Sequence, residues 1–163
     1  MSKLIVVCGL GGSGKTTTAK ELSKQLNIVC LHKDKIKATV HDVLDVLTPK
    51  ALNLLLKFTE EQISNGVDLI IEGPFNFKED AAIFEKWQEK FKVNLFFVIC
   101  SADNITRKDR VLSRERHACH QEADEKLLSQ IETESFDYSV MPGKHINITT
   151  NKPTEEIIKS IIA

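Results

Sequence analysis

Residues 9–16 read Gly-Leu-Gly-Gly-Ser-Gly-Lys-Thr, which matches the pattern G-x-x-x-x-G-K-[ST] at every specified position. Closely spaced glycines let backbone N–H groups turn inward around an anion, because no Cβ atom stands in the way. The apolar run at residues 4–8 predicts a buried strand before the loop, and residues 17–26, free of Gly and Pro, predict a helix after it. The stretch therefore has the strand–loop–helix context of a phosphate-binding loop.

The residue types in this loop predict how a nucleotide would be held. Lys15 would reach the β- and γ-phosphates with its positive charge, and the Thr16 hydroxyl would bind Mg²⁺. The positive end of the following helix would add to the attraction. Thr17 serves mainly as a spacer in the first helical turn. The predicted nucleotide-binding set within the loop is Gly9, Gly11, Gly12, Ser13, Gly14, Lys15, Thr16 and Thr17.

Length and composition fit a single globular domain over residues 1–163, because 163 residues can bury a sizeable core but leave too little for a second one. The hydrophobic content of 42% and charged content of 28% are ordinary, and a net charge of -1 predicts no general attraction to nucleic acid or membranes. We find no signal-peptide pattern and no apolar run of transmembrane length. We therefore expect a cytoplasmic protein.

The four cysteines and one His/Cys cluster are the residues that could form a metal or redox site. Three of the four cysteines lie in apolar, strand-like runs and none forms a C-x-x-C pair, so we expect reduced core thiols. His117, Cys119 and His120 look like metal ligands, but a zinc site needs three or four ligands in tetrahedral geometry. Since no convincing fourth ligand is nearby in the sequence, we expect no metal site in this cluster.

Asp34 follows a second apolar run, at residues 27–31, and is predicted to cap a helix that continues to Leu47. Ligands bind at the carboxyl ends of strands in an open parallel sheet, so Asp34 is a candidate for catalysis as well as for capping. A further helix is predicted from Pro49 to about Ser64. Two helices between consecutive strands predict a substrate lobe at about residues 34–65.

Glu72 ends the third predicted strand, at residues 67–73. A carboxylate at this point can orient water on Mg²⁺ or contact substrate; the alternative is a structural glutamate held by a neighbouring helix. In the loop that follows, Phe75 or Phe77 could line a pocket or pack against the next helix. That helix is predicted at residues 78–91 and carries Trp87, which we expect in the core.

Arginines cluster after the fourth predicted strand, at residues 94–100. Arg107, Arg110 and Arg114 fall on one helical face. Such a cluster suits the bracketing of a transferring phosphoryl group, although interspersed acidic residues leave a solvated, salt-bridged helix as the alternative. We expect a lid at about residues 107–125.

The rest of the chain continues the alternation of strands and helices. A short helix is predicted at residues 126–134, a fifth strand at 145–149 and a final helix from Pro153 to about 162. Alternating strands and helices predict an α/β fold with a parallel sheet and helices on both faces.

With these motifs in place, the chain resembles the small P-loop kinases and AAA-type ATP-binding proteins, a group that includes chloramphenicol phosphotransferase, zeta toxins and the kinase domain of polynucleotide kinase. The matching segments are the loop, residues 33–37 around Asp34, residues 72–75, and the arginine and histidine positions of residues 110–120. The resemblance implies a P-loop NTPase sandwich of the nucleoside-monophosphate-kinase type, with a five-stranded sheet of order 2-3-1-4-5. It also implies that ATP donates its γ-phosphoryl group to a substrate hydroxyl.

The resemblance further implies roles for individual residues. The catalytic residues would be Lys15, Asp34, Arg110 and Arg114, with Asp34 as base or hydroxyl orienter and Arg110 also touching the nucleotide. The metal residues would be Thr16 and Glu72. Glu72 stands where aspartate is common, so direct and water-mediated metal contacts are both open.

The sequence also bears on functions other than the phosphorylation of a small molecule. Residues 151–154 resemble the guanine-reading N-K-x-D motif, but Thr154 lacks the carboxylate that would accept the guanine hydrogens. A regulator that binds ATP without catalysis and a kinase acting on nucleic-acid ends are the alternatives. The near-neutral charge disfavours long nucleic acid and favours a small-molecule hydroxyl substrate. The acceptor's identity and the oligomeric state stay open.

Overall fold

The computed structural model describes residues 1–151, 155–156 and 159. The strands are β1 (Lys3–Cys8), β2 (Cys30–His32), β3 (Leu69–Glu72), β4 (Asn94–Ser101) and β5 (Lys144–Thr149). The helices are α1 (Lys15–Leu26), α2 (Lys33–Leu44), α3 (Ala51–Ser64), α4 (Lys78–Phe91), α5 (Asn104–Ser113) and α6 (Gln121–Gln130), with short 3-10 turns η1 (Ala118–His120) and η2 (Tyr138–Val140). The final helix predicted from Pro153 falls largely on residues outside the described ones.

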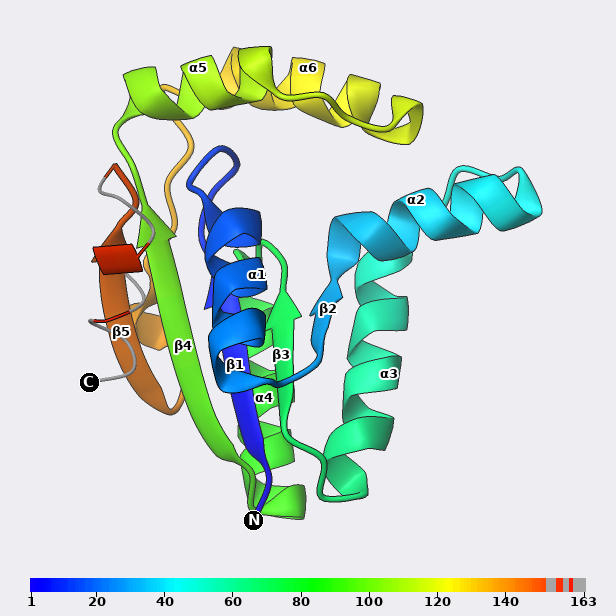
Figure 1. Ribbon diagram of the computed structural model, residues 1–163, viewed down its shortest axis with the longest axis vertical. Coiled ribbons are helices and arrows are strands. Elements are labelled where there is room, and N and C mark those ends of the chain that lie inside the picture. Colours follow the sequence, from blue (N-terminus) through cyan, green and yellow to red (C-terminus); the bar gives the residue numbers. More distant parts are fainter. Residues whose placement is uncertain (152–154, 157–158, 160–163) are drawn as a thin grey trace.

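All pairings in the five-stranded sheet are parallel, and the strand order is β2-β3-β1-β4-β5. This confirms the predicted α/β fold and the order 2-3-1-4-5. Figure 1 shows β1 near the middle of the sheet, with the phosphate-binding loop at its carboxyl end. The loop therefore lies at the edge where parallel sheets bind ligands.

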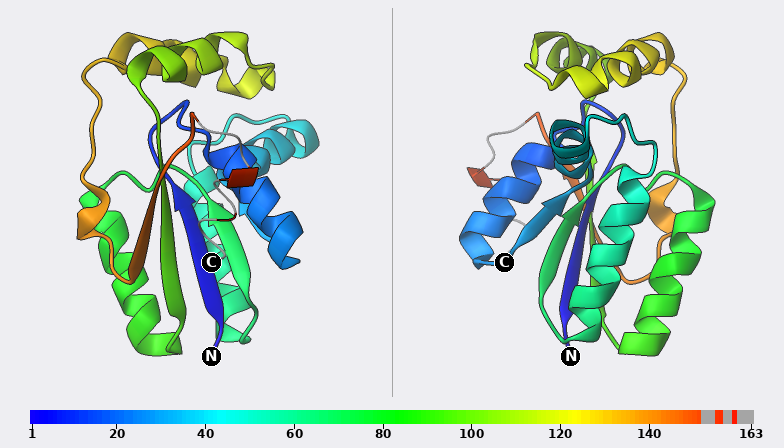
Figure 2. Two further views of the ribbon diagram at one scale, coloured as in Figure 1. Left: turned by 60° about the vertical axis from the view of Figure 1, so that its left-hand side comes forward. Right: turned by 90° about the vertical axis from the view of Figure 1, so that its right-hand side faces the viewer.

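The two faces of the sheet have separate hydrophobic cores, because successive side chains of a strand point to opposite faces. Leu4 and Val6 of β1 pack in the core beneath α3 and α4. Ile5 and Val7 pack in the core beneath α1. Figure 2 shows this layering edge-on, with α1 on one side of the sheet and α3 and α4 on the other.

Aromatic residues fill the core beneath α4. Phe84 lies edge-to-face against both Phe75 and Trp87, with ring centroids 5.4 and 5.6 Å apart. Trp87 is buried, as predicted. Phe75 packs in this core, whereas Phe77 is exposed and precedes α4 at its N-cap position.

The structure corrects three predictions around α2. The second strand begins only at Cys30, because it is an edge strand that pairs with β3 over three residues. Asp34 does not cap α2: His32 holds the N-cap position, and Asp34 lies in the first turn with its carboxylate beside Lys33 and Arg116. The helix ends at Leu44, before the predicted Leu47.

The region after α5 also differs from the prediction. The helix α6 begins at Gln121, five residues before the predicted start at Lys126, and ends at Gln130. Glu122 and Asp124 in its first turn favour this earlier start, because negative charge stabilises a helix N-terminus. Figures 1 and 2 show α5 and α6 crossing above the carboxyl ends of the strands. This arrangement places both helices over the phosphate-binding loop.

The cysteines agree with the expectation of reduced thiols in the core. All four cysteines are free, and only Cys30 is not fully buried. Among the described helices, none combines the length and apolar character needed to span a membrane.

Candidate active site

The phosphate-binding loop fits closely beneath α5 and α6. Gly12 has a φ of 76°, and a Cβ atom there would lie 2.6 Å from the carbonyl oxygen of Arg107. A Cβ atom on Gly11 would lie 2.3 Å from the side chain of Leu127 in α6. Glycine is therefore required at position 12 by the backbone conformation and by the close approach of α5, whereas a Cβ atom at position 11 would displace the end of the Leu127 side chain.

A cavity of about 610 Å³ opens beside the loop, between α2, the end of β3 and the segment that follows α5. The predicted site residues that line it are Gly11, Gly12, Gly14, Lys15, Thr16, Thr17, Asp34, Glu72, Arg110 and Arg114. Gly9 and Ser13 do not line it: Gly9 lies close to the backbone of Cys100, and Ser13 borders a smaller cavity of about 330 Å³. The fold thus brings most of the predicted set to one place.

Lys15 begins α1 and lines this cavity. Its Nζ donates a hydrogen bond of 3.0 Å to the carbonyl oxygen of Leu10 within the loop. Burial lowers the pKa of Lys15, while the charge of Glu72 acts in the opposite direction. An anion bound beside Lys15 would favour its charged form.

Glu72 ends β3 between the neighbouring strands, beside Val7 of β1 and His32 of β2. It is 5% exposed, and its Oε2 lies 3.1 Å from Nδ1 of His32. A strand neighbour therefore holds Glu72, and not the helix considered from the sequence. Thr16 and Glu72 both line the cavity with oxygen atoms, which are the ligands that Mg²⁺ prefers.

Arg107 and Arg110 of α5 hold the backbone of the loop. Arg107 is 4% exposed; its Nε donates to the carbonyl oxygen of Gly11 at 2.8 Å, and its Nη2 pairs with Glu134 at 2.7 Å. Arg110 donates to the carbonyl oxygen of Gly12 at 3.2 Å and to Thr150. Both guanidinium groups thus connect α5 to the phosphate-binding loop.

Arg114 and Arg116 lie beyond the end of α5 and line the cavity. Arg114 pairs with Asp124 at 2.6 Å, and Arg116 pairs with Asp34 at 3.1 Å. The Nε atom of each arginine is buried and has no hydrogen-bond partner within the described part of the chain. Buried donors usually have partners, so these two atoms fit a site that receives an anion such as a phosphate.

Asp34 lies on the α2 side of the same cavity. Burial acts to raise the pKa of Asp34, but the charges of Lys33, Arg116 and His120 outweigh it and lower that pKa to about 2. His120 is 4% exposed, and its Nε2 lies 3.2 Å from the backbone oxygen of Asp34. Burial lowers the pKa of His120, with Arg116 acting in the same direction and Asp34 against it.

Several cavity residues were not in the predicted site set. The polar and charged ones among them include Lys37, Arg116, His120, Asp124 and Thr150. Lys37 follows Asp34 by three positions on α2, so helical spacing could have indicated it. Thr150 donates to the carbonyl oxygen of Ser13 at 2.6 Å, a contact between residues 137 positions apart that no local pattern signals.

The sequence of this chain was compared with known families and curated proteins. Residues 4–134, well over half of the chain, match the model of a family described as AAA domain, AAA_33. The search of the curated proteins gave no match.

Solved structures with this fold were also found. A predicted kinase from Chloroflexus aurantiacus has a TM-score of 0.81 at 21% identity, covering 99% of this chain and 97% of its own. A sugar kinase from Janibacter sp. has a TM-score of 0.65 at 19% identity, covering 99% and 93%. The APS kinase CysC of Mycobacterium tuberculosis, solved with AMPPNP and APS, has a TM-score of 0.62 at 14% identity, covering 99% and 95%. This chain therefore has the fold of small P-loop kinases.

Proposed function

Because the chain belongs to the AAA domain family, and its fold is that of small P-loop kinases, we propose that it transfers the γ-phosphoryl group of ATP to a hydroxyl group of a small molecule. One observation carries the proposal. A single cavity joins the phosphate-binding loop to Asp34 and to the arginines Arg114 and Arg116. Phosphate-binding groups and a candidate acceptor-side carboxylate thus face the same space.

In this reaction the loop N–H groups and Lys15 would bind the β- and γ-phosphates, and Arg110 and Arg114 would approach them from the α5 side. Thr16 and Glu72 would hold Mg²⁺. When bound, Mg²⁺ neutralises charge on the phosphate oxygens. Transfer forms a bond between the acceptor oxygen and the γ-phosphorus and breaks the bond from that phosphorus to the β–γ bridging oxygen.

Asp34 would orient the acceptor hydroxyl and receive its proton late in the reaction. A carboxylate whose pKa is about 2 is a weak base, so early proton removal by Asp34 is disfavoured. The transition state of phosphoryl transfer is loose in most analyses and asks little of a base before the new bond forms. Orientation is then the larger contribution of Asp34.

The lid proposed for residues 107–125 has two parts in this structure. Arg107 and Arg110 connect its first part to the loop, whereas Arg114 and Arg116 form ion pairs with Asp124 and Asp34, which themselves border the cavity. We therefore place the moving part after α5. Its closure over ATP would exclude water from the transferring group.

The size of the cavity supports a small acceptor, since about 610 Å³ lies within the ordinary range for small-molecule sites. Among the proteins with this fold are a sugar kinase and an APS kinase, which supports the same class. A net charge of -1 gives no electrostatic reason to favour nucleic-acid ends.

Phosphoryl transfer from γ-labelled ATP should be screened across a panel of hydroxyl-containing metabolites, with Lys15→Ala as the inactive control. We expect Asp34→Asn to lower transfer on the order of a hundredfold or more, because it removes the orienting charge while keeping the side chain's size. ATP affinity should stay near that of the wild type. The matched control is Asp109→Asn, the same change at an exposed position of α5.

Two outcomes would oppose the proposal. Tight ATP binding without transfer to any acceptor, and without slow ATP hydrolysis, would indicate a non-catalytic ATP-binding regulator. If the Asp34→Asn variant transfers the phosphoryl group at a rate within a few-fold of the wild type, another residue orients the acceptor hydroxyl. Glu72 is then the first candidate.

A further inference from the structure

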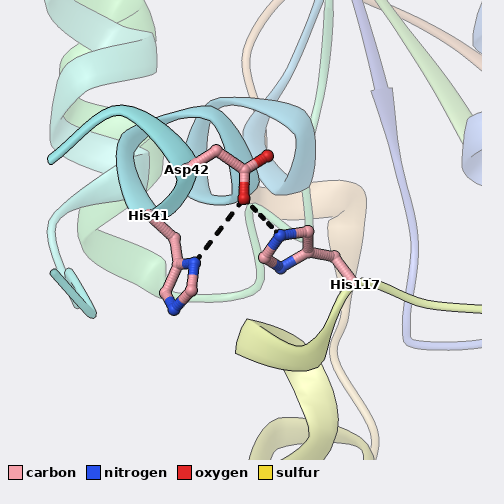
Figure 3. A group of neighbouring side chains, drawn as sticks. All are labelled: His41, Asp42 and His117. Carbon is pink, nitrogen blue, oxygen red and sulfur yellow. Dashed lines mark hydrogen bonds and ion pairs between the residues drawn. The ribbon is translucent and has the colours of Figure 1, made fainter. Parts of the chain in front are cut away.

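Two histidines and one aspartate meet where the segment after α5 touches α2. His41 and Asp42 lie in the last turn of α2, and His117 lies 75 residues from Asp42 in the sequence. Figure 3 shows both imidazole rings directed at one carboxylate oxygen. Nε2 of His117 lies 2.6 Å from Oδ1 of Asp42, and Nδ1 of His41 lies 3.6 Å from the same atom.

The spacing of these atoms is close to that of a metal site. The three atoms lie within 4.8 Å of one another. Ligands of a tetrahedral ion at 2.0–2.1 Å lie about 3.3 Å apart, so small side-chain rotations bring the three atoms to that distance. Nδ1 of His41 is also buried and has no hydrogen-bond partner among the residues that the structure describes. Its one contact there is the long one of 3.6 Å to Asp42, which an ion between the two atoms would replace.

The types of the three atoms indicate which ion would bind. Mg²⁺ and Ca²⁺ prefer oxygen ligands throughout, whereas two imidazole nitrogens and one carboxylate oxygen suit Zn²⁺ and related ions. Three protein ligands leave the fourth position to water, as in open zinc sites. The side chains are 31%, 60% and 29% exposed for His41, Asp42 and His117, so an ion can reach them from solvent.

We propose that His41, Asp42 and His117 bind a divalent transition-metal ion, with Zn²⁺ as the representative ion. Nδ1 of His117 accepts a hydrogen bond from the N–H of Cys119 at 3.1 Å, so metal binding through Nε2 shifts the ring proton to Nδ1 and gives up that bond. The resulting affinity is weaker than that of a closed four-ligand structural site. The site is therefore an exchangeable one.

A bound ion would join two parts of the molecule that meet at the cavity. His117 lies between Arg116, which pairs with Asp34, and His120, which contacts the backbone of Asp34. An ion at His117 ties this segment to the end of the helix that carries Asp34. A bound ion therefore restrains the segment around His117, which contacts Asp34, whether or not ATP is present.

The competing explanation for the cluster is a hydrogen-bonded histidine–aspartate pair without an ion. His117→Gln separates the two explanations, because a glutamine amide reaches the position of Nε2 and can still donate to Asp42 but is a poor zinc ligand. His41→Ala tests the site from the other element and leaves the pair of His117 and Asp42 in place. His145→Gln is the matched control, since His145 lies in β5 and its Nε2 contacts the backbone of Met141.

Zn²⁺ binding to the whole chain should be measured by calorimetry, and Co²⁺ binding by its visible absorption, with Mg²⁺ present in excess. We expect one ion per chain, at least tenfold weaker binding in both His41→Ala and His117→Gln, and unchanged binding in His145→Gln. Thermal melting shows whether each variant folds. If only one of the two variants folds, its Zn²⁺ affinity is enough to test whether the three side chains bind the ion. Binding that is unchanged in a folded variant of His41 or His117 overturns the proposal.

Hydrogen exchange without nucleotide provides a second measurement that does not depend on kinase activity. Zn²⁺ should slow exchange several-fold in residues 114–120 and in the last turn of α2 of the wild type, and leave exchange in His117→Gln unchanged. Equal slowing in both proteins would show that the ion acts elsewhere and would contradict the proposed site.

Discussion

Arg107 and Arg110 use their charges differently from Arg114 and Arg116, although all four lie within ten residues. The first pair donates to the carbonyl oxygens of Gly11 and Gly12, so it braces the phosphate-binding loop from α5. The second pair contacts carboxylates at the cavity and keeps its buried Nε atoms unpartnered within the described residues. A shared helical face therefore does not imply a shared role. Removing Arg107 should therefore affect folding, and removing Arg114 should affect ligand binding.

The largest expected effect is that of Arg107→Ala on stability. The change leaves Glu134 and the carbonyl oxygen of Gly11 without their partner in a largely buried place, which costs about 3 kcal/mol. The melting temperature should fall by roughly 6–12 °C. Calorimetry or circular dichroism measures this fall. Lys108→Ala, an exposed charge change on the same helix, is the control and should alter stability by less than about 0.5 kcal/mol.

Arg114→Ala should weaken nucleotide binding and leave stability nearly unchanged, in contrast to Arg107→Ala. Loss of charged hydrogen bonds to phosphate weakens the affinity for the ATP analogue AMPPNP with Mg²⁺ by roughly 10- to 100-fold. The melting temperature without nucleotide should change little, because the lost pair with Asp124 is partly exposed. If melting falls sharply and nucleotide affinity does not change, Arg114 belongs with the bracing pair.

Hydrogen exchange would locate the boundary between the two parts of the segment. On adding AMPPNP, amides of residues 114–120 should exchange several-fold more slowly, because their arginines order around the phosphates. Amides of α5 should change little, since Arg107 and Arg110 already hold that helix to the loop. Equal slowing in α5 and in residues 114–120 would indicate that the two parts move as one rigid lid. If exchange does not slow in either part, the segment is a solvated, salt-bridged one that does not respond to nucleotide.

The smallest expected effect concerns pH. Arg116 helps to lower the pKa of Asp34 to about 2, so this ion pair stabilises the fold above the unfolded pKa near 3.9 and loses that contribution as pH falls toward 2. In Arg116→Ala the pKa of Asp34 should rise toward its ordinary value. Carboxyl-carbon NMR titration measures the midpoint. An unchanged midpoint would show that Lys33 and His120 suffice to hold the carboxylate ionised.

Much of the fold was accessible from the sequence because its signals are local. The loop pattern, the apolar strands and the helix α4 are each encoded in adjacent residues, and the structure confirms α4 at both ends. The strand order was implied by the family resemblance, and the sheet confirms it. Prediction was poorer where an element depends on neighbours distant in sequence, as with the edge strand β2 and the start of α6.

The sequence by itself predicted the phosphate-binding loop, because closely spaced glycines followed by a lysine and a threonine form an anion-binding pattern within eight adjacent residues. Only the tertiary structure decided the partners of the other site residues. Arg107 meets Gly11 across 96 residues, and His120 meets Asp34 across 86. Such pairs depend on how α2, α5 and α6 pack over the sheet edge, and helical periodicity gives the face of a side chain but not the group that it reaches.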